Sequence, residues 1–290
     1  MAEPLPVCYL NGSFLPLREA RISPLDRGFL YGDGVYEVMP VYGGRPFRFA
    51  AHLERLGRSL AGLAMEDPHT PAQWRALLGT LLEKNAAGDC YLYWQVTRGT
   101  EYGRNHAPLP RLERTVFAFA APLSANSATV LEQGVSCITA IDTRWARCDI
   151  KSTALLANVL LRQLAVEAAA QETILLRDGE LTEASSASVF VVLGGEVLVP
   201  PQSRRILPGT TRSAVEEVCT RAAIACRTVP VSETQLRAAE EVWLSAATRE
   251  LQAVTAIDGH AVGSGRPGPL WRRAYAELQR YKQELAGTPW

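Results

Sequence analysis

Only three of the thirty basic residues in this chain are lysines, namely Lys84, Lys151 and Lys282. A lysine can lose its proton and attack a carbonyl carbon, whereas the guanidinium of arginine stays protonated. Lys84 and Lys282 lie in charged, helix-like stretches, which predicts ordinary surface positions. Lys151 follows the β-prone run Arg147-Cys148-Asp149-Ile150 and precedes an apolar helical pattern. It is the candidate for Schiff-base chemistry, although most lysines are solvated surface charges.

Amine chemistry of this kind normally uses pyridoxal phosphate as an electron sink, and that cofactor needs a phosphate cradle. Ile206-Leu207-Pro208-Gly209-Thr210-Thr211-Arg212 places a glycine turn and two hydroxyl residues at the predicted start of a helix. The amides and dipole of a helix N-terminus attract anions. A helix cap without any ligand is the alternative interpretation.

A pyridoxal phosphate site also needs a carboxylate that keeps the pyridine nitrogen protonated. Glu183 is a candidate, because it lies at a predicted strand end in the hydroxyl-rich stretch Leu181-Thr182-Glu183-Ala184-Ser185-Ser186. Taken alone, Glu183 is more typical of an exposed loop acid.

The composition favours a protein that recognises a small ligand. Thirty acidic residues balance thirty basic ones in 290 residues with 47% hydrophobic content, so no net field attracts nucleic acid or an anionic membrane. No leader-like or membrane-spanning stretch is evident, and six scattered cysteines lack metal or disulfide spacing. We expect reduced thiols, no metal and a cytoplasmic location.

Turn and periodicity patterns predict an α+β fold with two domains. In the first half we expect strands at 8–10, 34–41, 91–97 and 115–120, and helices at 50–63 and 71–85. Asn11-Gly12 and Gly43-Gly44 predict hairpins and a largely antiparallel sheet. The Pro/Ser/Asn-rich stretch 122–127 predicts a linker between an N-terminal domain, 1–121, and a larger C-terminal domain, 128–290.

The second half reads as a mainly antiparallel sheet with helices. Asp178-Gly179 and Gly194-Gly195 predict two more hairpins. We expect strands at 135–141, 173–177, 180–182, 188–193, 197–200 and 241–245, and helices at 153–170, 211–225 and 270–285. No glycine-rich dinucleotide motif and no repeat is present, which argues against Rossmann and solenoid folds.

Several motifs, in order along nearly the whole chain, resemble those of class IV, or fold-type IV, pyridoxal-phosphate aminotransferases, and most closely the bacterial D-amino-acid transaminases. They are Asp26-Arg27-Gly28, Tyr31-Gly32-Asp33-Gly34-Val35-Tyr36-Glu37, His52-Leu53-Glu54-Arg55-Leu56, Gln95-Val96-Thr97-Arg98-Gly99-Thr100, Arg147-Cys148-Asp149-Ile150-Lys151-Ser152, and the Glu183 and Gly209 segments quoted above. The resemblance implies a two-domain fold with pyridoxal 5'-phosphate bound between the domains.

The resemblance also implies roles for single residues. Lys151 would form the internal aldimine and move a proton between the substrate Cα and the cofactor. Glu183 would hold the pyridinium, and Leu207 would pack against the ring. Arg55, Thr210 and Thr211 would bind the phosphate, while Arg144 has a counterpart near the cofactor without a specified role.

The motif Arg104-Asn105-His106 decides the subgroup. It matches the Arg-x-His pair with which D-amino-acid transaminases hold the substrate carboxylate, together with a tyrosine, here Tyr36. The family implies that this clamp comes from the neighbouring subunit, and therefore a homodimer acting on amino acids and 2-oxo acids. Without the resemblance, Arg104 and His106 would be polar residues of an exposed loop.

Two positions depart from the pattern. Ser188 stands where relatives often have asparagine, and a phosphate-side hydroxyl pair is replaced by Ala246 and Ala247. Phosphate binding should then depend more on main-chain amides, including that of Ala247, and on Arg55. Neither change affects Lys151 or Glu183.

Other functions stay open at this stage. An aminodeoxychorismate lyase, a branched-chain L-amino-acid transaminase and an (R)-amine transaminase would all use the same lysine and glutamate. A cofactor-binding protein without activity is a fourth candidate. The Arg104 and His106 pair favours the D-amino-acid transaminase.

Overall fold

The structure is a computed structural model, and it describes residues 3–286, so the ends of the predicted domains at residues 1 and 290 lie outside it. The chain divides into two compact units. The first contains residues 3–124 and Ile150–Leu155, and the second contains Ala125–Asp149 and residues 156–286. The segment that carries Lys151 thus belongs to the first unit, although residues of the second unit flank it in sequence.

The first unit is built on a six-stranded sheet in which all neighbouring strands are antiparallel, as the hairpin turns predict. Asn11, Gly12, Gly43 and Gly44 all have positive φ, which explains these turn residues. The strand order is β2-β1-β6-β5-β3-β4, with bounds β1 (Val7–Leu10), β2 (Ser13–Pro16), β3 (Gly34–Tyr42), β4 (Arg45–Pro46), β5 (Cys90–Thr97) and β6 (Thr115–Pro122).

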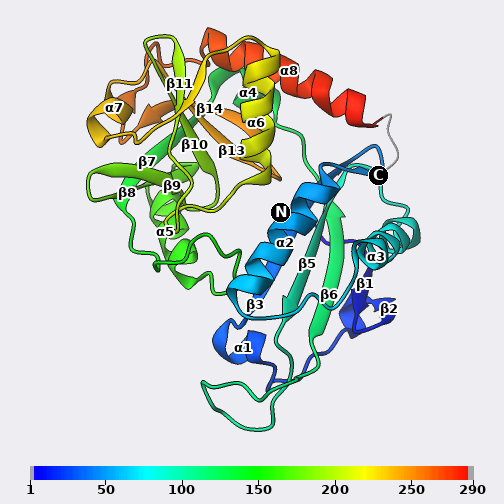
Figure 1. Cartoon of the computed structure of the whole chain (residues 1–290). Coiled ribbons are helices and arrows are strands. Elements are labelled where there is room, and N and C mark those ends of the chain that lie inside the picture. Colours follow the sequence, from blue (N-terminus) through cyan, green and yellow to red (C-terminus); the bar gives the residue numbers. More distant parts are fainter. Residues whose placement is uncertain (1–2, 287–290) are drawn as a thin grey trace. The chain divides into compact units, whose positions relative to one another are not determined.

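Two long helices pack on this sheet, α2 (Phe49–Gly62) along β3 and α3 (Pro71–Lys84) against β1 and β6 (Figure 1). A capping box formed by Thr70 and Gln73, with Pro71 in the first turn, begins α3. Buried aromatic and aliphatic side chains fill the space between sheet and helices, including Met39, Leu56, Trp74, Leu78 and Trp94. The short helices η1 (Leu17–Glu19) and α1 (Arg27–Tyr31) precede β3.

The second unit contains a nine-stranded mixed sheet. The predicted hairpins at Asp178-Gly179 and Gly194-Gly195 are confirmed, and parallel pairs join β11 to β12, β14 to β7 and β7 to β8. The bounds are β7 (Val135–Ile141), β8 (Glu172–Arg177), β9 (Glu180–Ala184), β10 (Ser188–Leu193), β11 (Glu196–Val199), β12 (Cys226–Thr228), β13 (Glu241–Ala246), β14 (Glu250–Ile257) and β15 (His260–Ala261).

Strand β14 was not predicted. It lies between β13 and β7, and four consecutive residues, Leu251 to Val254, are buried. A strand covered on both faces lacks the polar alternation by which a half-exposed strand is recognised.

The helices of the second unit are α4 (Ala128–Gln133), α5 (Leu156–Glu167), α6 (Thr210–Arg221), α7 (Glu233–Arg237) and α8 (Pro269–Ala286). The predicted helix 153–170 was too long. Its first residues instead pair with β3, because the Thr153 amide donates to the Gly34 carbonyl at 3.0 Å. The predicted helix 211–225 was also too long and ends at Arg221. Helix α6 packs against α8 and β13.

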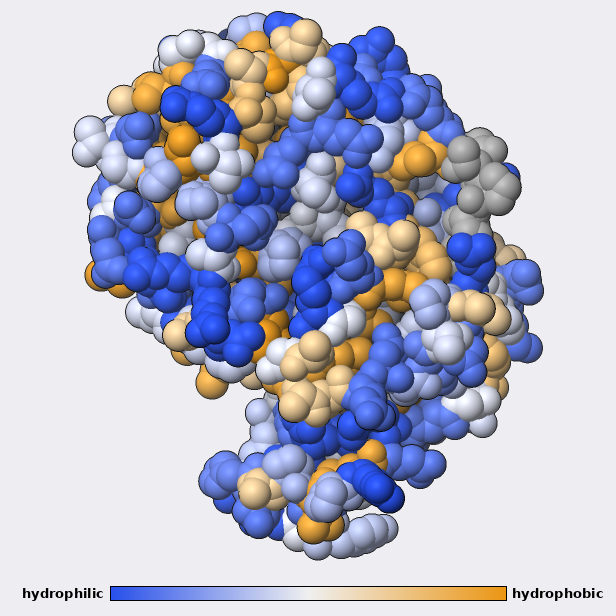
Figure 2. All heavy atoms as spheres, in the orientation of Figure 1, coloured by the Kyte–Doolittle hydropathy of each residue, from blue (hydrophilic) through white to orange (hydrophobic). Residues whose placement is uncertain are grey.

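Within residues 3–286, no helix has the length and apolar character needed to cross a membrane. Hydrophilic residues cover most of the face shown in Figure 2, and smaller hydrophobic areas interrupt them. All six cysteines are free in the structure, and five of them are buried, as predicted for mostly buried thiols.

Candidate active site

Lys151 is held in an extended segment beside the first residues of β3. The Tyr36 amide donates to the Lys151 carbonyl at 3.0 Å, and the Lys151 amide donates to the Ser59 hydroxyl of α2 at 3.1 Å. The Lys151 ammonium nitrogen lies 4.2 Å from the centre of the Tyr36 ring. The main chain of Lys151 is therefore fixed from two sides, while its side chain lies along an aromatic face.

The Tyr36 ring is itself positioned by stacking. It lies 5.5 Å from the Tyr93 ring, at an interplanar angle of 25°. Tyr36 and Tyr93 come from neighbouring strands β3 and β5, and cross-strand aromatic pairs of this kind stiffen a sheet face. Two residues predicted for the site, Lys151 and Tyr36, are thus brought together.

Arg55 lies next to a carboxylate that the sequence analysis did not single out. Glu37 is fully buried and accepts two hydrogen bonds from Arg55, at 2.8 and 2.6 Å, and one from His52 Nδ1 at 2.8 Å. Burial alone would raise the pKa of Glu37, but the charge and hydrogen bonds of Arg55, together with His52, outweigh it and lower the pKa to about 2. The spacing of His52 and Arg55 on one helix face was the available signal.

Glu183 is buried in the second unit and held by two donors on one oxygen. Arg144 Nη1 lies 2.5 Å from Glu183 Oε1, and the Leu207 amide donates to the same oxygen at 3.2 Å. Glu183 Oε2 has no hydrogen-bond partner within the part of the chain that the structure describes. One carboxylate oxygen is therefore fixed and the other can accept a bond from a ligand.

Arg144 acquires a role from this geometry. Its guanidinium also makes a paired interaction with Asp142, Nε to Oδ1 and Nη2 to Oδ2, both at 2.9 Å. Burial raises the pKa of the Glu183 carboxyl above its ordinary value, and Arg144 opposes that rise. Asp142 was missed in the sequence, although it lies only two residues from Arg144; its contact with Thr182 is made by folding.

The start of α6 has the properties of an anion cradle. Its N-cap is Gly209, so no side chain caps the first amides, and Thr210 and Thr211 form the first turn. A Cβ on Gly209 would come within 2.9 Å of the Ser188 hydroxyl, so any larger residue here would have to displace that hydroxyl. Ser245, which is paired with Ser188 across β10 and β13, is only 3% exposed, and its hydroxyl has no partner among the described residues.

These observations fit a phosphate group at this end of α6. An unpartnered buried hydroxyl beside uncapped helix amides is costly unless a ligand or water accepts its hydrogen bond. Ala247 directly follows β13 and offers only its main chain. Ala246 and Ala247 replace the hydroxyl pair of the family, and Ser188 and Ser245 supply hydroxyl groups nearby instead.

A second buried carboxylate fastens the neighbouring loops. Glu172 accepts hydrogen bonds from the hydroxyls of Ser185 and Ser186, and Arg249 Nη2 lies 2.7 Å from its Oε2. Ser185 follows the Glu183 strand and Arg249 follows Ala247, so Glu172 connects the two segments. Glu172 carried no signal in the sequence, because its contacts with Ser185, Ser186 and Arg249 are made only through folding.

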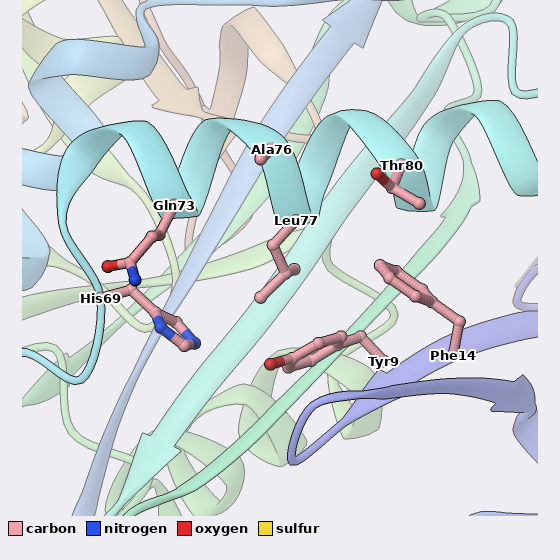
Figure 3. Close-up of a pocket in the computed structure, with 7 residues that line it drawn as sticks. All are labelled: Tyr9, Phe14, His69, Gln73, Ala76, Leu77 and Thr80. Atoms are coloured by element: carbon pink, nitrogen blue, oxygen red, sulfur yellow. The ribbon is translucent and has the colours of Figure 1, made fainter.

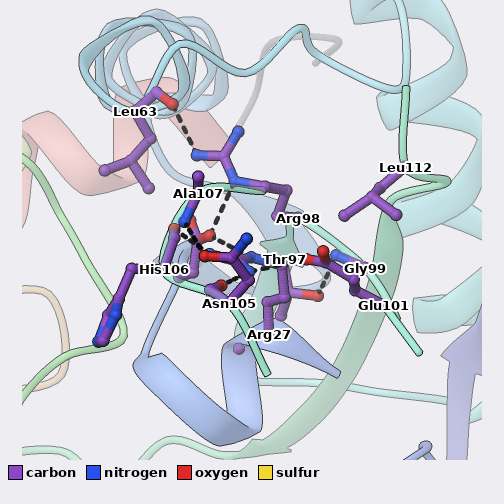
Figure 4. A network of polar contacts seen from close by, with 12 residues as sticks. Arg27, Leu63, Thr97, Arg98, Gly99, Glu101, Asn105, His106, Ala107 and Leu112 are labelled. Carbon is purple, nitrogen blue, oxygen red and sulfur yellow. Dashed lines mark hydrogen bonds and ion pairs between the residues drawn. The ribbon is translucent and has the colours of Figure 1, made fainter. Parts of the chain in front are cut away.

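Arg104 and His106 lie in an exposed loop that returns to the side chain of Arg27. The Arg104 guanidinium lies 5.5 Å from the Tyr31 ring centre, and the rings of His106 and Tyr31 are 5.6 Å apart. Arg27 donates to the carbonyls of Asn105 and His106 (Figure 4). Among residues 3–286 of one chain, no hydrogen bond, ion pair or ring contact links Arg104 or His106 to Tyr36 or Lys151.

The other two lysines differ from each other. Lys84 is exposed, as predicted. The surface position predicted for Lys282 is wrong, because its side chain is only 15% exposed and pairs with Glu250. Helix α8 turns Lys282 toward Glu250 at the start of β14 rather than toward solvent.

A surface hollow of about 310 Å³ lies elsewhere in the first unit. Figure 3 shows Gln73, Ala76, Leu77 and Thr80 of α3 facing Tyr9, Phe14 and His69 across it. None of the predicted site residues lines this hollow, so it is not the candidate active site.

Comparisons with known proteins identify the family. The family model described as amino-transferase class IV matches residues 34–257. A D-alanine aminotransferase of Bacillus licheniformis is 38% identical over 93% of this chain and 94% of that protein. One from Listeria innocua is 36% identical over 94% of this chain and 93% of that protein.

The solved structures that resemble this chain are also aminotransferases. The branched-chain amino acid aminotransferase of Escherichia coli has a TM-score of 0.87 at 25% identity, covering 93% of this chain and 92% of that one. A T.th. branched-chain amino acid aminotransferase with pyridoxamine 5'-phosphate has a TM-score of 0.88 at 26% identity, covering 98% of this chain and 95% of that one. The chain therefore belongs to aminotransferase class IV and is a pyridoxal-phosphate-dependent transaminase of fold type IV.

Proposed function

We propose that this transaminase moves an amino group from a D-amino acid such as D-alanine to a 2-oxo acid such as 2-oxoglutarate. The observation that carries the proposal is the exposed pair Arg104 and His106, supported on Tyr31, in a chain that resembles D-alanine aminotransferases over most of its length. A guanidinium and an imidazole presented together suit a carboxylate.

Pyridoxal phosphate, when bound, supplies an aldehyde carbon that captures an amino group and a ring that accepts electrons. Lys151 provides the amine for attachment and then moves the proton at the substrate Cα. With the substrate carboxylate held on the Arg104 and His106 side and Lys151 approaching one face of the ring, only one enantiomer would present its α-hydrogen to the lysine.

Glu183 would keep the pyridine nitrogen of the cofactor protonated, since Arg144 and the Leu207 amide occupy Oε1 and leave Oε2 open. A fixed anion at this position favours the charged form of the ring. Leu207 follows Ile206 in the same segment, and its half-exposed side chain is suited to pack on the ring.

Phosphate binding is assigned to the amides and hydroxyls at the start of α6, Thr210 and Thr211, and to the main chain of Ala247. Arg55 supplies positive charge, with its guanidinium oriented by Glu37. The orphaned hydroxyl of Ser245 supports a phosphate at this end of α6.

The substrate carboxylate is assigned to Tyr36 together with Arg104 and His106 of a second copy of the chain. A homodimer is supported by the outer face of α5, where large apolar side chains are exposed, namely Leu156, Val159, Leu160, Leu164 and Val166. A contiguous apolar helix face of this kind is typical of a buried interface.

A cytoplasmic location is also proposed. The support is chemical: six cysteines without a disulfide suit a reducing compartment.

The decisive experiment is a half-reaction on the purified holoenzyme, with D-alanine or L-alanine added in separate cuvettes. Loss of the visible cofactor band with D-alanine alone, accompanied by pyruvate and pyridoxamine phosphate, is the expected result. A response to L-alanine alone would overturn the proposal in favour of an L-specific enzyme. If neither amino acid reacts, the D-specific assignment is wrong, and aminodeoxychorismate and (R)-amines become the substrates to examine.

A further inference from the structure

Arg27 is a buried cation whose contacts concentrate on the loop that carries Arg104 and His106. Its side chain is 4% exposed. Nη1 donates to the Asn105 carbonyl at 2.7 Å and Nη2 to the His106 carbonyl at 2.9 Å. The same guanidinium bonds Glu101 at 2.8 Å and Asp33 at 2.9 Å. One side chain thus joins α1, the loop and the start of β3.

The loop itself has little other support. Residues 102–111 are all exposed, with Tyr102 92% exposed, and a loop without buried side chains depends on its main-chain contacts for a defined shape. In Figure 4 the two carbonyls face Arg27, while the imidazole of His106 stands apart from the network. The bonds from Arg27 therefore restrain the main chain and leave the side chains available.

Tyr31 adds a second support. Its ring centre lies 4.7 Å from the Arg27 guanidinium and 5.5 Å from that of Arg104. Two cations over one aromatic ring repel each other, so the carboxylates of Asp33 and Glu101 are needed to offset the charge of Arg27. With that charge offset, Tyr31 can serve as a platform for Arg104.

We propose that Arg27 is a positioning residue that fixes the main chain of Asn105 and His106, so that Arg104 and His106 meet the substrate carboxylate in one arrangement. This inference rests on the proposed function for the identity of the ligand. The contact between Arg27 and the loop does not depend on it.

The geometry requires arginine rather than a cation of any kind. The guanidinium presents a planar set of donors that reaches two carbonyls and two carboxylates together, whereas an ammonium on a flexible chain cannot. Arg27→Lys keeps the positive charge next to Asp33 and Glu101 but loses the planar set of donors. It is therefore the informative variant.

The first measurement is steady-state kinetics with D-alanine. Arg27→Lys is expected to raise KM about tenfold with kcat changed less than about twofold, as the loss of a uniform binding contact predicts. Arg104→Ala should raise KM as well, and the double variant should be no worse than Arg104→Ala alone, because both changes remove the same clamp.

The matched control is Arg98→Lys. Arg98 bonds the same carboxylate, Asp33, but its other side-chain bond goes to Leu63 rather than to Asn105 or His106. If Arg98→Lys raises KM as much as Arg27→Lys, the effect is general loosening of the unit, and the inference is overturned.

The second measurement reads the loop without catalysis. Trypsin cleavage after Arg104 and Arg111 should be at least about fivefold faster in Arg27→Lys than in wild type, because a loop released from its anchor opens more often. Arg27→Lys also keeps the number of tryptic sites unchanged. If Arg27→Lys does not fold, Glu101→Gln removes one of the anchors of Arg27 and should change KM and cleavage in the same direction.

The outcomes distinguish the proposed carboxylate clamp from the positioning role of Arg27. Faster cleavage in Arg27→Lys with an unchanged KM in Arg104→Ala would leave Arg27 as the loop anchor but remove the proposed clamp. A raised KM in Arg104→Ala with unchanged KM and cleavage in Arg27→Lys and Glu101→Gln would keep the clamp and refute the positioning role.

Discussion

Arg144 Nη1 lies 2.5 Å from Glu183 Oε1 while the rest of its guanidinium is engaged by Asp142. The carboxylate is thereby held through one oxygen and open at the other. This arrangement differs from a simple ion pair, because Asp142 also fixes the position of the Arg144 guanidinium. Arg144 can therefore be altered without removing a contact of Glu183 Oε2.

Replacing Arg144 with methionine should reduce kcat/KM about 10- to 100-fold, because the buried Glu183 loses the charge that favours its ionised form. With burial unopposed, the pKa of Glu183 should rise further. Activity needs the carboxylate, so the acid limb of the pH profile should move to higher pH. An unchanged limb would contradict the role given to Arg144.

The control for this variant is Arg147→Met. Arg147 pairs with Asp149 at a half-exposed position. We expect its pH profile to match that of the wild type.

Lys151→Ala should abolish transamination and the visible absorbance of the covalently attached cofactor, because no other residue in the described part of the chain is placed to supply the amine. The measurement is the absorbance spectrum together with pyruvate formation from D-alanine. Lys84→Ala, at an exposed position of α3, should leave both unchanged. Turnover persisting in Lys151→Ala would disprove the mechanism.

The stability of the first unit should depend on pH through Glu37. Its pKa is lowered from 4.5 to about 2, so the ionised carboxylate stabilises the fold fully above pH 4.5, and the contribution is lost as the pH falls toward 2. The contribution is about 3 kcal/mol, from the difference between the two pKa values. Thermal unfolding midpoints at about pH 6, 4 and 3 should fall more steeply in wild type than in Glu37→Gln.

Glu54→Gln is the comparison for Glu37→Gln. Glu54 lies on α2, but its side chain is 72% exposed and pairs with a half-exposed Arg58. Its removal should leave the pH dependence of the unfolding midpoint as in wild type. If both variants change the pH dependence of the unfolding midpoint equally, Glu37 is not the source of that dependence.

Leu160→Glu should separate the proposed homodimer, because a charge in an apolar interface is desolvated without a partner. Sedimentation velocity is expected to show a shift from dimer toward monomer, with loss of activity at low protein concentration. Gln283→Glu adds the same charge at an exposed position of α8 and should remain dimeric. A monomeric wild type, or a dimeric Leu160→Glu, would argue against α5 as the interface.

Local signals predicted much of the fold. The turns at Asn11-Gly12 and Asp178-Gly179 were identified because these residues readily adopt positive φ, and the helix predicted at 71–85 matches α3 to within one residue. Strand β14 and the start of α5 were not, because both depend on what packs around them. Burial on two faces hid β14, and pairing with β3 removed the first turn of α5.

The residues of the candidate site show the same contrast between local signals and contacts made by folding. Lys151 could be proposed because lysine is rare in this chain, whereas Glu183 could be proposed only from the motif around it. Glu172 and the function of Arg27 could not, because each acts through contacts that only folding creates. Residue type identifies groups that react, whereas the groups that orient them become visible only in the fold.

The placement of Ile150–Leu155 in the first unit has a consequence for biosynthesis. When residue 124 has left the ribosome, all six strands of the first sheet are present, but the edge of β3 at Gly34 to Tyr36 has no partner until residues 151–153 emerge. The N-terminal unit therefore cannot complete itself before synthesis of the second unit has begun, and a fragment ending at residue 124 should remain prone to association through that edge. Lys151, to which we assign the amine chemistry, thus lies in the segment that pairs with this edge of β3.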